Sequence, residues 1–387
     1  MRKGNFMKTL FRNGRFYVNG TFVLGDLLAE DGVIREITEV QGGDAAVVYD
    51  MEEKLVVPGF IDIHTHGAAG VDVNKATAED YETICRFFAA QGTTAWLGSV
   101  LTDTKEQTLW CIEEYKKWKT REHQGAELLG IHLEGPFLSP EYKGAMPEHL
   151  LRKGDLELIK EYQKAAEGDV KYITLSPEIE GNIPMIPELK KLGIQVAIGH
   201  SGADYDTACA AIEAGARGAT HTGNAMKLLH QHFPAIWGAV LESDKVFCEI
   251  ICDGRHLHPG TVRLIIKTKG LDQVVAVTDS IMAAGLPDGN YKLGVNDVIV
   301  ENGDARLASG GSRAGSTLTM GAALKNLLEY TGRPLREVLR LLTENPARLI
   351  GVYDRMGSIE AGKEANLVVL DEACKVLKTY VHGRECR

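Results

Sequence analysis

Eight short apolar runs recur through the middle of this 387-residue chain, and stretches with helical periodicity separate most of them. Residues 78–90 and 205–214 are two such helical stretches. Strands that alternate with helices form parallel sheets, and eight strands are the number that closes a (β/α)8 barrel. The sequence therefore predicts an α/β fold built around a TIM-type barrel. Its strands are expected at 60–63, 93–98, 128–133, 172–175, 194–198, 218–220, 246–251 and 274–277.

Both ends of the chain look different from this middle part. The first 57 residues are strand-like, and three dipeptides typical of hairpin turns interrupt them: Asn13-Gly14, Asn19-Gly20 and Asp31-Gly32. Residues 365–386 have a similar composition. Because chain ends often lie close together, we predict one small β-sandwich domain built from both termini. The predicted boundaries are 1–57 plus 356–387 for this domain and 58–355 for the barrel.

One segment interrupts the barrel pattern. Residues 291–308 read as strands around an Asn302-Gly303 turn, which predicts an antiparallel insertion after the last barrel strand. Helical patterns resume at 318–330 and 334–342.

Composition and charge exclude several classes of function. The net charge is -10 and no basic run occurs, which argues against nucleic-acid binding. The N-terminal region lacks a continuous apolar stretch, so we expect neither a signal peptide nor a membrane span. The seven cysteines are scattered and odd in number, which indicates reduced thiols and a cytoplasmic location.

Two histidines follow the first predicted barrel strand. GFIDIHTHG (59–67) places His64 and His66 one residue apart, and alternate residues of a strand share a face. Both imidazoles can therefore point into the barrel mouth, where TIM barrels have their active sites. A His-x-His pair at this position indicates a divalent metal site. His132, further along the chain, either lines the site lower down or is a core histidine.

Later predicted strands end in, or are followed by, four more side chains that can bind a metal ion: Glu134, His200, His221 and Asp279. A carboxylate that follows an apolar strand needs a cation or hydrogen-bond donors, and the alternative for Glu134 is a buried salt bridge. Two histidines and one carboxylate are a typical catalytic zinc set. Asp279 can exchange a proton with water as a general acid and base, although it also suits a helix N-cap. Together these residues predict a metal-dependent hydrolase.

Seven motifs carry a family resemblance: PGFIDIHTHG, HLEGPFLSP, GHSGA, HTGNAM (221–226), DGRHLHP (253–259), VTDSIMAAGLPDG and AGSTLTM (314–320). In series they resemble the N-acetylglucosamine-6-phosphate deacetylases of the amidohydrolase superfamily, from about Leu55 to the C-terminus. The resemblance implies deacetylation of N-acetylglucosamine 6-phosphate to glucosamine 6-phosphate and acetate in amino-sugar catabolism. It also implies a barrel with a small β-sandwich domain, usually as a homodimer.

The resemblance assigns roles to individual residues. Glu134, His200 and His221 would be the core metal ligands, His64 and His66 would hold a second metal, and Asp279 would be the general acid and base. One or two divalent ions per subunit are expected, with zinc or iron first and manganese or cobalt as alternatives. His256 matches a histidine that reaches the partner subunit's substrate. The implied substrate-binding residues are Ala145, Met146, Asn224, Ala225, His232, His256, Ala314, Gly315 and Ser316.

Three positions depart from the family pattern. Met146 stands where relatives often carry a histidine or glutamine that orients the acyl amide, and methionine cannot donate a hydrogen bond. The relatives' HLYN reads HTGN here (221–224). Their phosphate-anchoring Arg-Glu-Pro-Gly becomes HFPA (232–235), which replaces a bidentate arginine by His232. Four side chains are candidates to replace that arginine: Arg255, Arg313, Lys227 and His230.

These departures keep an alternative open, namely deacylation of a different N-acyl amino sugar, either another epimer or an unphosphorylated one. A cyclic-amide hydrolase is less expected, because many carry a lysine after the fourth strand and this chain reads ITLSPE there. A non-catalytic sugar-binding relative would have lost metal ligands, and every one is present.

Overall fold

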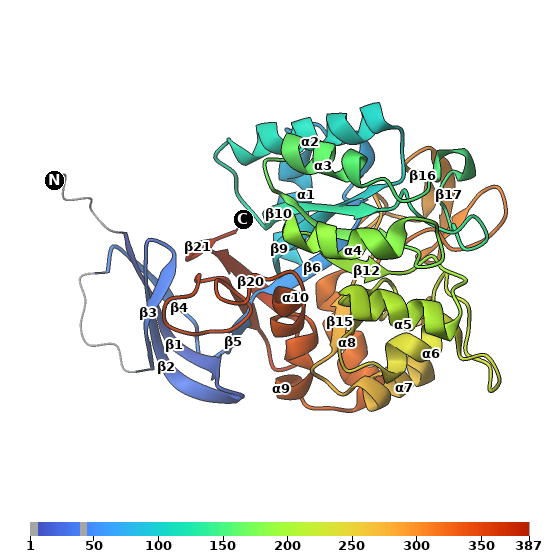
Figure 1. The fold of residues 1–387 in the computed structure, drawn as a ribbon. Coiled ribbons are helices and arrows are strands. Elements are labelled where there is room, and N and C mark those ends of the chain that lie inside the picture. Colours follow the sequence, from blue (N-terminus) through green and yellow to red (C-terminus); the bar gives the residue numbers. More distant parts are fainter. Residues whose placement is uncertain (1–6, 39–44, 387) are drawn as a thin grey trace.

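A computed structural model describes residues 7–38 and 45–386 (Figure 1). Its barrel is an eight-stranded parallel sheet whose strands follow one another in chain order. All eight predicted strands are confirmed, within a few residues at their ends. They are β6 (Phe60–Thr65), β9 (Thr93–Leu101), β10 (Glu127–Glu134), β11 (Val170–Leu175), β12 (Gln195–Ile198), β13 (Gly218–Ala219), β14 (Phe247–Ile251) and β15 (Val274–Val277).

The barrel closes between its first strand, β6, and the residues that follow its last strand, β15. A parallel bridge joins Thr65 to Ser280. Lower down, the Thr278 hydroxyl donates to the buried carboxylate of Asp62 at 2.5 Å. The closure therefore joins the two segments that carry His64 and Asp279.

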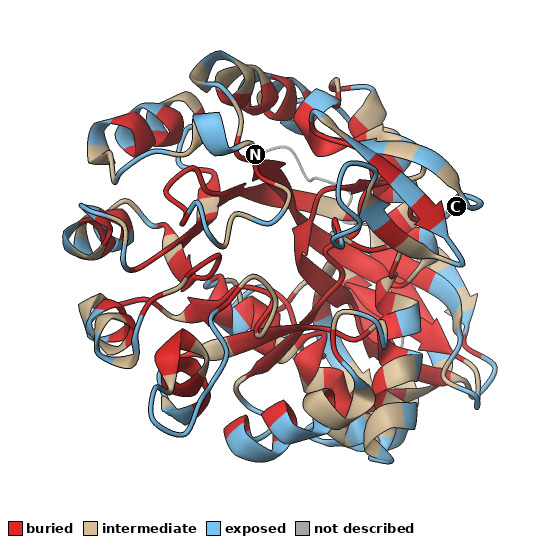
Figure 2. Cartoon of the chain, turned by 90° about the vertical axis from the view of Figure 1, so that its right-hand side faces the viewer, coloured by how far each residue is buried: buried red, intermediate tan, exposed pale blue. Residues whose placement is uncertain are grey.

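Amphipathic helices cover the outside of the barrel, with buried faces toward the strands and exposed faces outward (Figure 2). In α3, for example, Leu158, Ile159 and Tyr162 are buried, and the carboxylate of Asp155 caps the N-terminus by accepting from Leu158 N. The helices are α1 (Asp80–Ala90), α2 (Lys105–Lys119), α3 (Leu156–Ala165), α4 (Asn182–Lys191), α5 (Tyr205–Ala214), α6 (Ala235–Glu242), α7 (Pro259–Lys269), α8 (Met320–Thr331), α9 (Leu335–Val338) and α10 (Glu344–Leu349).

Strands from both termini share one mixed sheet beside the barrel, in the order β21-β20-β19-β5-β1-β2-β3 with β4 paired to β1. The sheet curls on itself, because Phe11 of β1 and Tyr380 of β20 lie three strands apart yet their rings are 5.0 Å apart. The predicted joining of the two chain ends is thus confirmed. The strands are β1 (Lys8–Val18), β2 (Thr21–Glu30), β3 (Val33–Thr38), β4 (Val47–Asp50), β5 (Leu55–Pro58), β19 (Leu367–Leu370), β20 (Val376–Val381) and β21 (Arg384–Glu385).

Two of the three predicted turns in this domain are hairpin turns, and one prediction was wrong. Asn19-Gly20 and Asp31-Gly32 each have positive φ at both residues, the conformation that tight hairpins require. Asn13-Gly14 instead lies inside β1, where the pairing register with β2 shifts by one residue between Phe11 and Gly14. The dipeptide forms a β-bulge, which uses the same left-handed conformation at Asn13 to bend a continuous strand.

The antiparallel insertion is also confirmed. β16 (Gly289–Leu293), β17 (Asn296–Glu301) and β18 (Asp304–Leu307) form a separate sheet, and Asn302-Gly303 joins the last two. A short ribbon of β7 (Gly67–Ala68) and β8 (Val71–Asp72) follows β6. All seven cysteines are free thiols. Within the described residues, no helix is both long and apolar enough to cross a membrane.

Candidate metal centre and active site

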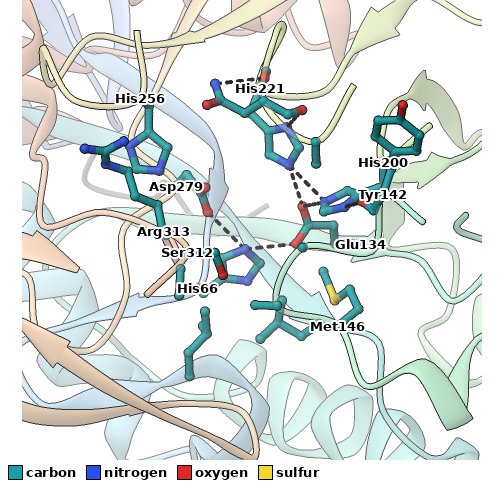
Figure 3. A pocket seen from close by; sticks show the side chains of 18 of the residues that line it. His66, Glu134, Tyr142, Met146, His200, His221, His256, Asp279, Ser312 and Arg313 are labelled. Carbon is teal, nitrogen blue, oxygen red and sulfur yellow. Dashed lines mark hydrogen bonds and ion pairs between the residues drawn. The ribbon is translucent and has the colours of Figure 1, made fainter. Parts of the chain in front are cut away.

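The six predicted metal and catalytic residues converge at the C-terminal mouth of the barrel. Figure 3 shows all of them except His64. Three of them lie just past a strand in the left-handed region, with φ of 48° at His200, 29° at His221 and 49° at Asp279. This conformation costs a non-glycine residue on the order of 1–3 kcal/mol and clusters at functional sites. The turns that follow these strands are therefore held in a strained form that aims the side chains into the mouth.

Glu134 is the centre of the cluster, because its carboxylate approaches all four imidazoles. The distances from its oxygens to Nε2 are 3.0 Å for His200, 3.2 Å for His221, 3.1 Å for His66 and 3.4 Å for His64. All five side chains are at most 6% exposed.

Asp279 completes the cluster from the opposite side of the mouth. Its Oδ1 lies 3.2 Å from Nε2 of His66 and 3.6 Å from Nε2 of His64. Its side chain is 10% exposed, so it can meet a water or substrate molecule.

The hydrogen bonds of Nδ1, the ring nitrogen that faces away from the cluster, show which nitrogen of each imidazole carries the proton. Nδ1 of His66, His200 and His221 each faces a backbone carbonyl, of Ser99 at 3.0 Å, Tyr142 at 2.8 Å and Asn224 at 3.1 Å. A carbonyl only accepts, so Nδ1 carries the proton and Nε2 of the neutral ring keeps its lone pair.

These lone pairs point at one another and at carboxylate oxygens. Nε2 of His200 and Nε2 of His221 are 3.0 Å apart. Nε2 of His64 is fully buried and has no hydrogen-bond partner. Lone pairs at this spacing repel unless a cation or added protons lie between them, so the donor set fits divalent metal ions.

The ligand atoms fall into two buried groups, one of Glu134, His200 and His221 and one of His64, His66 and Asp279. Within each group the ligand atoms lie within 4.8 Å of one another. The arrangement is consistent with a binuclear metal site. A third group, Glu127, Glu364 and His382, lies away from this mouth, and Arg355 supplies a positive charge to both of its carboxylates.

Without metal ions, protons on the imidazoles balance the negative charges of the carboxylates in the cluster. Burial opposes the imidazolium of His66, but hydrogen bonds to Asp279 and Glu134 outweigh it and raise the pKa to about 9. Burial likewise opposes ionisation of Glu134, but the charge of His64 and the other imidazoles hold its pKa well below its usual range. Metal ions would therefore displace protons when they bind.

This proton binding makes the stability of the metal-free protein depend on pH. The folded state holds the His66 proton up to pH about 9, while the unfolded state releases it near the ordinary pKa of 6.5. We therefore expect the unfolding free energy of chelator-treated protein to fall by about 3 kcal/mol between these two pH values. Denaturant titrations across this range test it, with His66→Asn as the variant that should weaken the dependence. A constant or rising stability would contradict the assignment.

A pocket of about 330 Å³ opens above the cluster. Most of the predicted substrate-binding residues line it, and Figure 3 shows Met146 on one side and His256 with Arg313 on another. The predicted residues in the wall are Ala145, Met146, Asn224, Ala225, His256, Ala314 and Gly315. His256 lines the pocket of its own chain, and its reach to a partner subunit's substrate stays a prediction.

Two predicted substrate residues lie outside this wall. His232 is exposed, in the loop that follows Met226, and does not line the pocket. Ser316 is buried beneath it, where its hydroxyl donates to Thr278 O at 2.6 Å and its backbone N–H donates to Asp279 O. Ser316 therefore holds the Asp279 turn in place.

The prediction left out one residue with a clear position in the structure, Glu249, and it named Arg313 only as one of four candidate phosphate-binding side chains. Arg313 lines the pocket, and Glu249 of β14 accepts a hydrogen bond from Nδ1 of His64 at 3.0 Å. A glutamate inside the apolar run 246–251 was the available signal, because a buried carboxylate needs donors. His132 is a core histidine, bonded to Ser99 and Thr174 below the site.

Comparisons with known proteins agree with this geometry. Residues 55–386 match the amidohydrolase family. The N-acetylglucosamine-6-phosphate deacetylase of Bacillus subtilis (strain 168) is 36% identical over 334 residues, which are 86% of this chain and 84% of that protein. The chain belongs to the N-acetylhexosamine-6-phosphate deacetylase family of amidohydrolases.

Two further relatives differ in the sugar phosphate that is named with them. The N-acetylgalactosamine-6-phosphate deacetylase of Escherichia coli O157:H7 is 34% identical over 92% of both chains. A variant of the Mycobacterium smegmatis deacetylase, solved in complex with N-acetyl-D-glucosamine 6-phosphate, is 31% identical and has a TM-score of 0.89. That match covers 99% of this deacetylase and 100% of the solved chain.

Proposed function

We propose that the protein hydrolyses N-acetylglucosamine 6-phosphate to glucosamine 6-phosphate and acetate. The observation that carries this proposal is the buried cluster of four imidazole lone pairs and two carboxylates at the floor of a sugar-sized pocket. The relatives support the choice of substrate, since the B. subtilis protein carries this activity in its name and the M. smegmatis variant was solved with this sugar phosphate.

The chemistry divides between the metal site and Asp279. When bound, a divalent cation acidifies water and polarises a carbonyl group. Asp279 takes the proton of the attacking water as a general base and later gives it to the departing amine nitrogen as a general acid. The histidine and carboxylate donors suit zinc or iron, with manganese or cobalt as alternatives.

Arg313 is our candidate for phosphate recognition in place of the missing arginine. It is the only lysine or arginine among the residues that line the pocket in the described part of the chain. Asp304 orients its guanidinium through Nε and Nη2, at 2.9 Å and 3.3 Å. Asp304 also pairs with Arg306, so one carboxylate is shared by two guanidinium groups and a net positive charge remains.

The Arg313→Ala variant tests this role. We expect its KM for the sugar phosphate to rise about 10- to 100-fold, since a hydrogen bond to a charged group contributes roughly 1.5–3 kcal/mol. The kcat should change little, because uniform binding energy is lost. Arg306→Ala is the matched control, since Arg306 pairs with the same Asp304 but does not line the pocket. An equal loss on unphosphorylated N-acetylglucosamine would exclude phosphate recognition by Arg313.

The experiment that tests the whole proposal measures amine release with metal-replete protein on three substrates. These are N-acetylglucosamine 6-phosphate, its galactosamine epimer and unphosphorylated N-acetylglucosamine. The highest kcat/KM is expected for the first. The N-acetylgalactosamine-6-phosphate relative makes the epimer the second candidate, and a preference for it or for the unphosphorylated sugar would replace the proposed substrate.

A homodimer remains our expectation for the assembly. The loop before α6 exposes three large apolar side chains, with 59% of Leu228, 52% of Leu229 and 70% of Phe233 accessible. Such a group beside an active-site pocket favours a protein contact.

A further inference from the structure

Glu249 is a fully buried glutamate in the middle of β14, below the cluster of candidate metal ligands. It accepts three hydrogen bonds: from the Tyr172 hydroxyl at 2.6 Å, from Nδ1 of His64 at 3.0 Å and from the backbone N–H of His221 at 3.2 Å. No lysine or arginine of the described residues forms an ion pair with it. The negative charge of Glu249 is therefore compensated by the imidazoles of the site.

The contact distinguishes His64 from the other three histidines of the cluster. Those three donate Nδ1–H to neutral backbone carbonyls, whereas His64 donates to a carboxylate. A carboxylate partner fixes the tautomer and also makes the far nitrogen a stronger metal donor. That far nitrogen, Nε2 of His64, is the buried atom without a partner.

We propose that Glu249 is a positioning residue that controls filling of the second metal position, the group of His64, His66 and Asp279, without touching the metal itself. It holds His64 with Nδ1 protonated and Nε2 directed into the cluster. The inference rests on the proposed metal-dependent function and on both groups of ligand atoms holding a metal ion.

Charge balance supports the same role. Glu134 and Asp279 together carry two negative charges among the imidazoles, which one divalent cation neutralises. Glu249 adds a third negative charge next to His64. With one divalent cation bound, the cluster therefore keeps a net negative charge until a second cation enters. Removing Glu249 should thus weaken the second metal more than the first.

The test is a Zn²⁺ titration of chelator-treated protein against a competing chromophoric chelator, with bound zinc counted by elemental analysis. We expect two equivalents for the unchanged protein. Glu249→Ala should keep one tight equivalent and bind the second about 10- to 100-fold more weakly, the usual cost of losing such a partner. If Glu249→Ala does not fold, the isosteric Glu249→Gln serves, because it lacks the charge.

Tyr172→Phe is the matched control, since it removes another hydrogen bond of the same carboxylate but leaves His64 bonded, and it should bind both equivalents normally. The double variant Glu249→Ala with His64→Ala should bind the second zinc no more weakly than His64→Ala alone. An unchanged second affinity in both Glu249 variants, or an equal loss of both equivalents, would overturn the role of Glu249. A single equivalent in the unchanged protein would instead overturn the two-metal premise.

Discussion

The kcat of the Asp279→Asn variant should fall by about 10³-fold or more, because the substitution removes the group that both takes and returns the proton. Asparagine has nearly the same shape as aspartate, but its amide cannot accept the proton of the attacking water. The first metal group does not include Asp279, so at least one equivalent of metal should stay bound. The measurement is amine release under saturating substrate, paired with a metal count on the same sample.

Two outcomes would contradict this role for Asp279. Turnover close to that of the unchanged protein would show that another group moves the proton. Loss of all metal would show that the carboxylate acts mainly as a ligand, since its Oδ1 faces Nε2 of both His64 and His66.

The Glu134→Ala variant should lose essentially all bound metal and all turnover above background. Glu134 is the carboxylate that approaches all four imidazoles, so its removal takes a ligand from one group and a neighbouring charge from the other. Elemental analysis after dialysis measures the metal, and circular dichroism checks that the barrel still folds. Full metal occupancy in this variant would refute the central position of Glu134.

Much of the site could be predicted from the sequence, because a parallel barrel converts chain order into spatial proximity. Glu134 and Asp279 are 145 positions apart in the chain, yet both follow strands that end at one mouth. A short apolar run that ends in a histidine or an acid is therefore informative without any knowledge of side-chain contacts. All eight strands were predicted within a few residues because each is a short apolar run, and stretches with helical periodicity separate most of these runs.

Features that depend on the reach of side chains were not predictable in this way. Arg313 was one of four candidate cations, and only the fold shows that it lines the pocket while Arg255 instead donates to Asn302 O. The bonds of Glu249 to His64 and Tyr172 cross from one strand to two others in the barrel interior. The Asn13-Gly14 bulge was misread because a bulge and a hairpin turn use the same left-handed dihedral angles.

The terminal sheet also has a consequence for how the chain is made. β5 pairs with β1 on one edge and with β19 on the other, and Pro58 is the register partner of Leu367. During synthesis the barrel residues leave the ribosome before β19 does, so the backbone N–H and C=O groups on that edge of β5 have no strand partner until then. Any chain that stops short of β19 keeps that edge open to other molecules. Pairing of β5 on both edges, and with it the closed form of the terminal sheet, therefore depends on the last residues of the chain to be synthesised.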